Sequence, residues 1–185
     1  MATVLEAEET EFADFFASTW ARLFRTTFAV AGDAGHAEDA LQSAFAKAYA
    51  TWHRVRSTGH PEAYVRRMAV NEVLRARRRA WWRAERSGTP PEATAAPAGS
   101  STEDDFADRA EVWEALMSLA PRQRAVLVLR YYEDLSEQEI ADVLNCSRGT
   151  VKSQASDALS ALRRRHAAGA TPTEGSLSWD SRTTS

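Results

Sequence analysis

The stretch SEQEIADVLNCSRGTVKSQ, residues 136–154, has the spacing of two short helices joined by a tight turn. Ser136 and Glu139 stand three positions apart, as in a capping box. In that motif the serine hydroxyl accepts a hydrogen bond from the Glu139 amide, and the glutamate carboxylate accepts one from the serine amide. The sequence therefore predicts a helix that begins near Ser136 and ends near Leu144.

The turn that follows is Asn145-Cys146-Ser147. Asparagine tolerates the left-handed backbone conformation in which helices commonly end. Ser147 can cap a second helix that begins at Arg148. The apolar residues of this second helix share one stripe: Val151, Ala155, Ala158, Leu159 and Leu162. The pattern as a whole predicts a helix-turn-helix.

The opposite surface of the second helix carries side chains that suit base edges in a DNA major groove. Arginine and lysine bind guanine acceptors or phosphates, glutamine can bind adenine, and serine is permissive. The candidate contact residues are Arg148, Thr150, Lys152, Ser153 and Gln154. A helical hairpin that merely closes a small bundle has the same pattern, so the motif alone leaves both interpretations open.

A second candidate DNA surface lies on a helix expected over residues 61–86, where Pro61 and Glu62 suit a first helical turn. Positions three or four apart on one stripe are Arg67, Asn71, Arg75, Arg78 and Trp82. Separated DNA strands require aromatic platforms and polar groups for exposed base edges as well as positive charge. Tyr64 and Trp81 could add platforms. The structural alternative is a solvated arginine face with packed tryptophans.

Two further helices precede this one. Apolar periodicity predicts a helix from Phe12 to Phe28 that Gly32 and Gly35 end, and a second helix after Asp33. Residues 56–60 are expected to form a polar loop. The apolar stripe expected in the core of the second helix is Leu41, Phe45, Ala48, Tyr49 and Trp52.

Charge is divided sharply along a chain whose net charge is only −3. Residues 52–86 carry ten basic and three acidic groups, whereas residues 87–111 carry one basic and six acidic groups. The second segment is also rich in Pro, Ala, Ser and Gly, which is typical of a flexible linker. The sequence thus predicts an all-α fold of two small helical domains: residues 10–86, a flexible acidic linker 87–111, residues 112–166, and a disordered tail 167–185.

Composition argues against several other classes of protein. Cys146 is the single cysteine, so no intrachain disulfide can form. The acidic residues 1–11 do not resemble a signal peptide, and no apolar run is long enough to span a membrane, so we expect a cytoplasmic protein. Scattered histidines and the lack of a phosphate-binding glycine loop predict no metal, no cofactor and no enzymatic activity.

Three segments together resemble the extracytoplasmic-function sigma factors of the sigma-70 family, in particular the actinobacterial SigE-like group. They are residues 39–49, 64–71 and 145–153. The resemblance covers about residues 10 to 165, in the family's order of a sigma-two domain, an acidic linker and a sigma-four domain. It implies an alternative sigma factor that binds core RNA polymerase and directs promoter-specific initiation of transcription.

The same resemblance assigns roles to particular residues. Asn71 and its stripe, with Tyr64, would read the unwound minus-ten element, with a base pocket in the loop 56–61. The helix-turn-helix would read the minus-thirty-five duplex, although Gln154 and Asp157 stand where many relatives have arginine. Core RNA polymerase and promoter DNA are the implied partners, and an anti-sigma protein is an optional third. Core polymerase would contact Asp39, Gln42, Lys47 and Tyr49.

Two other functions remain open at this point. A helix-turn-helix repressor or activator that acts without joining the polymerase would have to dimerise to read paired half-sites. A purely protein-binding adaptor would have no use for an exposed stripe of arginine and aromatic side chains.

Overall fold

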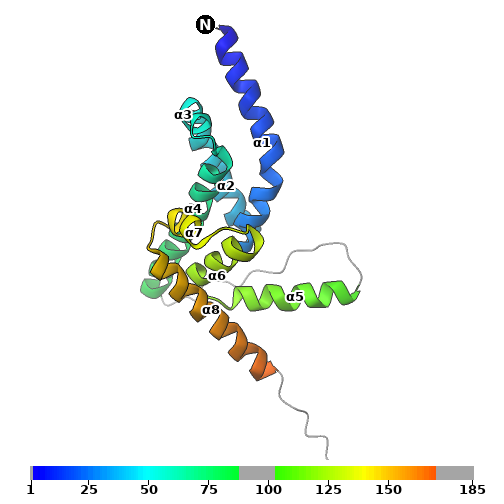
Figure 1. The fold of residues 1–185 in the computed structure, drawn as a ribbon. Helices are drawn as coiled ribbons and strands as arrows, with labels where there is room; N and C mark the ends of the chain where they lie inside the picture. The colour runs from blue at the N-terminus through cyan, green and yellow to red at the C-terminus, as the bar shows by residue number, and fades with distance from the viewer. Residues whose placement is uncertain (1, 88–102, 170–185) are drawn as a thin grey trace, which may run out of the picture.

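The structure is a computed structural model that describes residues 2–87 and 103–169. All the regular elements in these two ranges are helices, which confirms the predicted all-α class (Figure 1). The first domain contains α1 (Ala2–Ala31), α2 (Ala34–Ala50), α3 (Trp52–Ser57) and α4 (Pro61–Ser87). The second domain contains α5 (Glu103–Met117), α6 (Pro121–Leu127), a π-helical turn η1 (Val128–Tyr132), α7 (Glu137–Leu144) and α8 (Arg148–Gly169).

Helices α1, α2 and α4 pack against one another around the core of the first domain. Helix α2 follows Asp33, as the sequence predicts, and the carboxylate of Asp33 caps it by accepting the His36 amide at 2.7 Å. Gly32 ends α1 with a φ of +73°, a value that side chains with a Cβ rarely adopt. The expectation that Gly35 also ends α1 is wrong, because Gly35 lies inside α2. The fully or almost fully buried residues here include Leu23, Leu41, Phe45, Trp52, Val65 and Ala69.

Two other expectations for the first domain need correction. Tyr49 does not lie in the core: it is 50% exposed, and its ring packs against that of Phe12 in a tilted arrangement with the centroids 4.9 Å apart. The predicted polar loop 56–60 is shorter than expected, because α3 continues through Ser57. The connection to α4 is therefore only Thr58 to His60, with Gly59 at a φ of +74°.

Helix α5 begins earlier than the sequence suggests. Periodic apolar residues return only at Val112, yet α5 starts at Glu103, so residues 103–111 of the expected flexible linker are helical. Residues 88–102, the rest of that linker apart from Ser87, lie outside the described ranges. The predicted disordered tail also begins too early, because α8 continues to Gly169, and residues 170–185 again lie outside the described ranges.

The helix-turn-helix follows the sequence prediction closely. The Glu139 carboxylate accepts the Ser136 amide at 2.8 Å, the Ser136 hydroxyl accepts the Glu139 amide at 3.3 Å, and α7 begins there. Asn145 adopts the left-handed conformation with a φ of 49° and ends α7. The Ser147 hydroxyl accepts the Thr150 amide at 3.1 Å at the start of α8.

The two domains share one apolar cluster. Val30 and Val73 of the first domain pack in the same cluster as Leu129 and Ile140 of the second. Helix α4 contacts α6 and α7, and α1 contacts α6 and η1. Among the described residues, no helix is both long enough and apolar enough to cross a membrane.

Candidate nucleic-acid interface

The recognition surface of α8 stands on the outside of the second domain. Its predicted residues are Arg148, Thr150, Lys152, Ser153 and Gln154. Val151 and Ala158 point inward and are fully buried, which fixes the rotation of the helix. The side chains of Arg148 and Lys152 are consequently 60% and 63% exposed. Two cations are thus presented on one exposed surface, as contact with DNA requires.

Glu137, at the start of α7, links these two cations to each other. Its carboxylate lies 3.7 Å from the Arg148 guanidinium and 3.6 Å from the Lys152 ammonium, and it accepts a hydrogen bond from Arg130 at 3.4 Å. Loss of hydration alone would raise the pKa of Glu137, but the Arg130 bond and the neighbouring positive charges outweigh it and lower that pKa. The local sequence pattern did not indicate that Glu137 contacts Arg148 and Lys152.

The other three predicted residues of this surface have different surroundings. Thr150 takes part in the cap of α8, with its amide bonded to Ser147. Ser153 is exposed and donates its hydroxyl to the Thr150 carbonyl at 3.0 Å. Gln154 is half-buried. Arg148 and Lys152 are therefore the best placed of the five for contact with a duplex.

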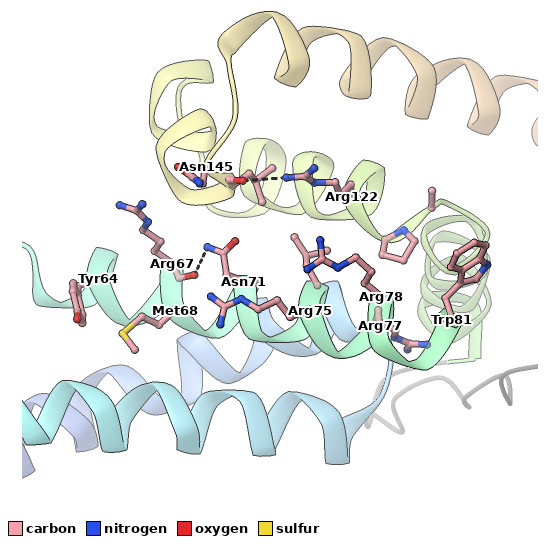
Figure 2. Close-up of a pocket in the computed structure, with 14 residues that line it drawn as sticks. Tyr64, Arg67, Met68, Asn71, Arg75, Arg77, Arg78, Trp81, Arg122 and Asn145 are labelled. Atoms are coloured by element: carbon pink, nitrogen blue, oxygen red, sulfur yellow. Dashed lines mark hydrogen bonds between the residues drawn. The ribbon is translucent and has the colours of Figure 1, made fainter. Parts of the chain in front are cut away.

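The second candidate surface, the α4 stripe, consists of Tyr64, Arg67, Asn71, Arg75, Arg78 and Trp82. All but Trp82 line a groove of about 760 Å³ between α4 and the second domain (Figure 2). Trp82 lies outside the groove, and its neighbour Trp81 lines it instead; both rings are 53% exposed. The structure thus brings five of the six predicted residues together in one concave site.

The groove is strongly basic. Besides the three predicted arginines, Arg77 and Arg122 line it. Arg122 lies on the second-domain wall of the groove and donates to the Leu144 carbonyl of the same domain at 3.1 Å (Figure 2). Arg75 pairs with Glu72 at 3.1 Å, so part of its charge is already balanced. Local sequence patterns do not predict that Arg122 lines a groove beside α4, because Arg122 and α4 are far apart along the chain.

Asn71 lies where the two domains meet. Its side-chain nitrogen donates to the Arg67 carbonyl at 2.8 Å and to the Val143 carbonyl of α7 at 2.6 Å. A side-chain amide has only two N–H groups to donate. Both are therefore engaged in this arrangement, one of them by the second domain.

The residues expected to contact the polymerase lie on the outside of α2. Asp39, Gln42, Lys47 and Tyr49 are all exposed. Gln42 and Tyr49 border an apolar groove of about 510 Å³, whereas Lys47 pairs with Glu72 of α4 at 3.7 Å. The remaining residues of this apolar groove are Phe12, Phe16, Trp20, Phe45 and Ala46.

The aromatic part of the apolar groove was missed at the sequence level. Phe16 belongs to the apolar stripe of α1, which predicts a buried side chain, yet it is 38% exposed. Only the packing of α1 against α2 shows that this side chain remains accessible. A base pocket was expected in the loop 56–61; Arg56, which lies in α3, is held by Glu8 at 2.8 Å and by Glu11 at 2.9 Å.

Comparison with known proteins decides the family. The family model of sigma-70 region 2 matches residues 15–83, and that of sigma-70 region 4 matches residues 109–162. The RNA polymerase sigma-E factor of Streptomyces coelicolor is 36% identical over 84% of this chain and 86% of its own length. The chain belongs to the sigma-70 family, in its extracytoplasmic-function group.

A second relative agrees with this assignment, and a solved structure has the same fold. The ECF RNA polymerase sigma factor SigL of Mycobacterium tuberculosis is 32% identical over 76% of this chain and 80% of its own length. A solved structure of the sigma factor RpoE from Bartonella quintana, in complex with the anti-sigma factor NepR, matches the fold with a TM-score of 0.66 and 23% identity, covering 83% of this chain and 95% of the other. The first domain thus corresponds to sigma-70 region 2, and the second domain to region 4.

Proposed function

We propose that this sigma factor binds core RNA polymerase and directs it to promoters, with region 4 reading the minus-thirty-five duplex and region 2 capturing unpaired bases of the minus-ten element. The observation that supports this most directly is the presence of two chemically different DNA-suited surfaces on one chain. One surface presents exposed cations on a recognition helix, and the other combines arginines, an amide and aromatic rings. The protein thus acts by binding and not by catalysing a reaction.

Region 2 supplies the groups that single-stranded DNA needs. Tyr64 and Trp81 are 38% and 53% exposed and can stack against bases that have left the duplex. Stacking on an aromatic ring stabilises an unpaired base by about 1–3 kcal/mol. This offsets the few kcal/mol that taking a base out of the stack costs. Asn71 would then bond the edge of a captured base.

Region 4 supplies contacts to a closed duplex. Arg148 and Lys152 project from the first two turns of α8, where recognition helices approach base edges and phosphates. Asp157 is exposed on the same helix and cannot neutralise phosphate, although a carboxylate can accept from a cytosine amine. The structure supports upstream reading that depends mainly on Arg148 and Lys152.

Binding of core polymerase would use the apolar groove beside α2. Exposed aromatic side chains in a concave surface are typical of residues that dominate the energy of protein–protein interfaces. Tyr49 and Phe16 have that character here, and Gln42 provides a polar neighbour at the rim. A subunit of RNA polymerase acts in the cytoplasm, and an anti-sigma protein remains an optional further partner.

Initiation in a purified system tests the proposal. Core RNA polymerase with the protein should produce defined start sites from a pool of genomic fragments, and core polymerase alone should not. A repressor or activator that acts outside the polymerase would shift DNA as a dimer without core enzyme. The proposal fails if the chain binds DNA in that way and directs no start site.

A further inference from the structure

The contact between the two domains centres on a buried carboxylate. Glu133 follows the π-helical turn η1, and its amide donates to the Val128 carbonyl at 3.2 Å. Its side chain is completely buried, although it belongs to region 4 and all its side-chain partners belong to region 2. They are Arg22 at 2.9 Å, Arg66 at 3.3 Å and the hydroxyl of Thr26.

These partners come from two helices of region 2, so Glu133 fixes the rotation of region 4 against both. Arg22 lies on α1, and Arg66 lies on α4. The charge of Glu133 is the main cause that raises the pKa of Arg22, with loss of hydration acting in the opposite direction. Glu62 completes the cluster at 2.9 Å from Arg22. A buried ion pair contributes little net stability, because desolvation offsets the attraction, but it can specify one arrangement.

Apolar contacts accompany this ionic cluster. Val70 and Val73 of α4 share a buried cluster with Ile140, Val143 and Leu144 of α7. Phe28 of α1 stacks on Trp113 of α5 with ring centroids 4.7 Å apart. The domains therefore meet through a mixed apolar and ionic interface, and not through the acidic linker alone.

The closed arrangement engages Asn71, which is half-buried, whereas the other residues of the α4 stripe remain exposed: Tyr64, Arg67, Arg75, Arg78 and Trp82. Asn71 donates both of its N–H groups to carbonyls, one of them on α7, so neither is available to a base. Arg67, Arg75 and Arg78 face a groove whose opposite wall is Pro121, Arg122 and Asn145 of region 4. Promoter elements two duplex turns apart are separated by about 70 Å. Region 4 cannot occupy the upstream element while its α7 touches Asn71.

We propose that in the free protein region 4 is an intramolecular partner that masks the amide of Asn71 in the α4 stripe, and that Glu133, held by Arg22, Arg66 and Thr26, keeps the two domains in this register. Opening of this contact then precedes capture of a base. This inference rests on the proposed role of the α4 stripe in reading unpaired DNA. Its structural part, the Glu133 contact, can be tested without DNA.

Single-molecule energy transfer in the full-length chain measures the opening directly. Dyes are placed at Ser57→Cys on α3 and Arg163→Cys on α8, both exposed positions, with Cys146→Ser removing the natural thiol. Replacing the carboxylate by Glu133→Gln exchanges charge-assisted bonds for neutral ones and should increase the ratio of open to closed molecules about tenfold. Thr26→Val removes the region 2 hydroxyl that bonds Glu133 and should also increase the ratio of open to closed molecules.

The matched control is Glu114→Gln. Glu114 also binds an arginine, Arg165 at 3.0 Å, but both side chains belong to the second domain and are well exposed. This control should leave the open-to-closed ratio unchanged. Equal ratios in Glu133→Gln, Thr26→Val and Glu114→Gln would overturn the proposed latch, whatever promoter assays show, because no DNA or polymerase is present.

A second measurement tests the masking. A single-stranded oligonucleotide with the minus-ten sequence of a mapped start site should bind the polymerase-free Glu133→Gln chain about tenfold more tightly than wild type, because more of the chain is binding-competent. If Glu133→Gln increases the fraction of open molecules but does not bind the oligonucleotide more tightly, the masking of Asn71 in the α4 stripe is refuted. Absence of any start site with core polymerase would instead count against the proposed function and leave the energy-transfer result standing.

Discussion

The recognition surface of α8 and the α4 stripe both present arginine and polar side chains, but the second domain leaves the first surface exposed and engages Asn71 of the second. Arg148 and Lys152 are about three-fifths exposed and are held by a residue of their own domain. Asn71, in contrast, is bonded to Val143 of the other domain. If the two surfaces read DNA as proposed, the difference teaches that one chain can keep its duplex-reading surface accessible while Asn71 becomes free for a base only when the domains separate.

The largest effect is expected from Asn71→Ala. If Asn71 bonds a captured base, its removal should lower the rate of open-complex formation by at least tenfold, as expected for the loss of 1.4 kcal/mol or more (about one decade). Binding of core polymerase should be unchanged, because the apolar groove that is proposed to bind it lies on α1 and α2 and does not include Asn71. Potassium permanganate footprints and run-off transcription measure the two steps. Open-complex formation at the wild-type rate in this variant would show that Asn71 does not bond a captured base.

Lys152→Ala should weaken the other surface without affecting opening once the complex has formed. Loss of one phosphate contact lowers the slope of log affinity against log salt by about 0.9, and loss of a base contact costs about 1–3 kcal/mol. Binding of holoenzyme to upstream duplex DNA, measured over a salt series, distinguishes the two. Arg165→Ala is the control, because this arginine lies on the same helix but pairs with Glu114. Equal losses in both variants would indicate only a general effect of charge.

Gly32→Ala should disturb the junction of the domains while leaving α8 unchanged. Gly32 has a φ of +73°, and an added Cβ would collide with the sulfur of Met117 in α5. We expect a loss of about 1 kcal/mol or more in the free energy of unfolding. Thermal or urea unfolding measures the loss. Wild-type stability in this variant would show that α5 does not pack against Gly32.

The smallest effect concerns the capping box that begins α7. Hydrogen bonds from the Ser136 hydroxyl and amide hold the pKa of Glu139 below its usual 4.5. A carboxylate with a lowered pKa contributes stability above its usual pKa and loses it as the pH falls through the folded value. Glu139→Gln should therefore be less stable than wild type at neutral pH and lose that difference in acid. A difference that persists at every pH would exclude this cause.

Local signals allowed much of the fold to be predicted. The Ser136 capping box and the left-handed Asn145 depend on residues within a few positions of each other, and both are present. The α4 stripe was predicted from helical periodicity, which needs only the spacing of side chains on one element. These features require no knowledge of how the domains meet.

Contacts between distant segments could not be predicted in the same way. Charged residues usually lie at the surface of a protein, so the sequence does not predict that Glu133 is buried. It is buried because arginines of α1 and α4 surround it. The exposure of Tyr49 and Phe16 depends on how α1 packs on α2. The early start of α5 could not be predicted, because its first residues are rich in acidic side chains and lack apolar periodicity. The burial of Glu133 and the exposure of Tyr49 and Phe16 depend on partners far away in sequence.

The most direct test of the account is to change the spacing between the two promoter elements. Inserting about five base pairs between them turns one element half a duplex turn away from the other. If one chain reads both elements, initiation by core polymerase with this protein should fall at least tenfold, and removal of the upstream element should then have no further effect. Undiminished initiation from the half-turn insertion would contradict the account.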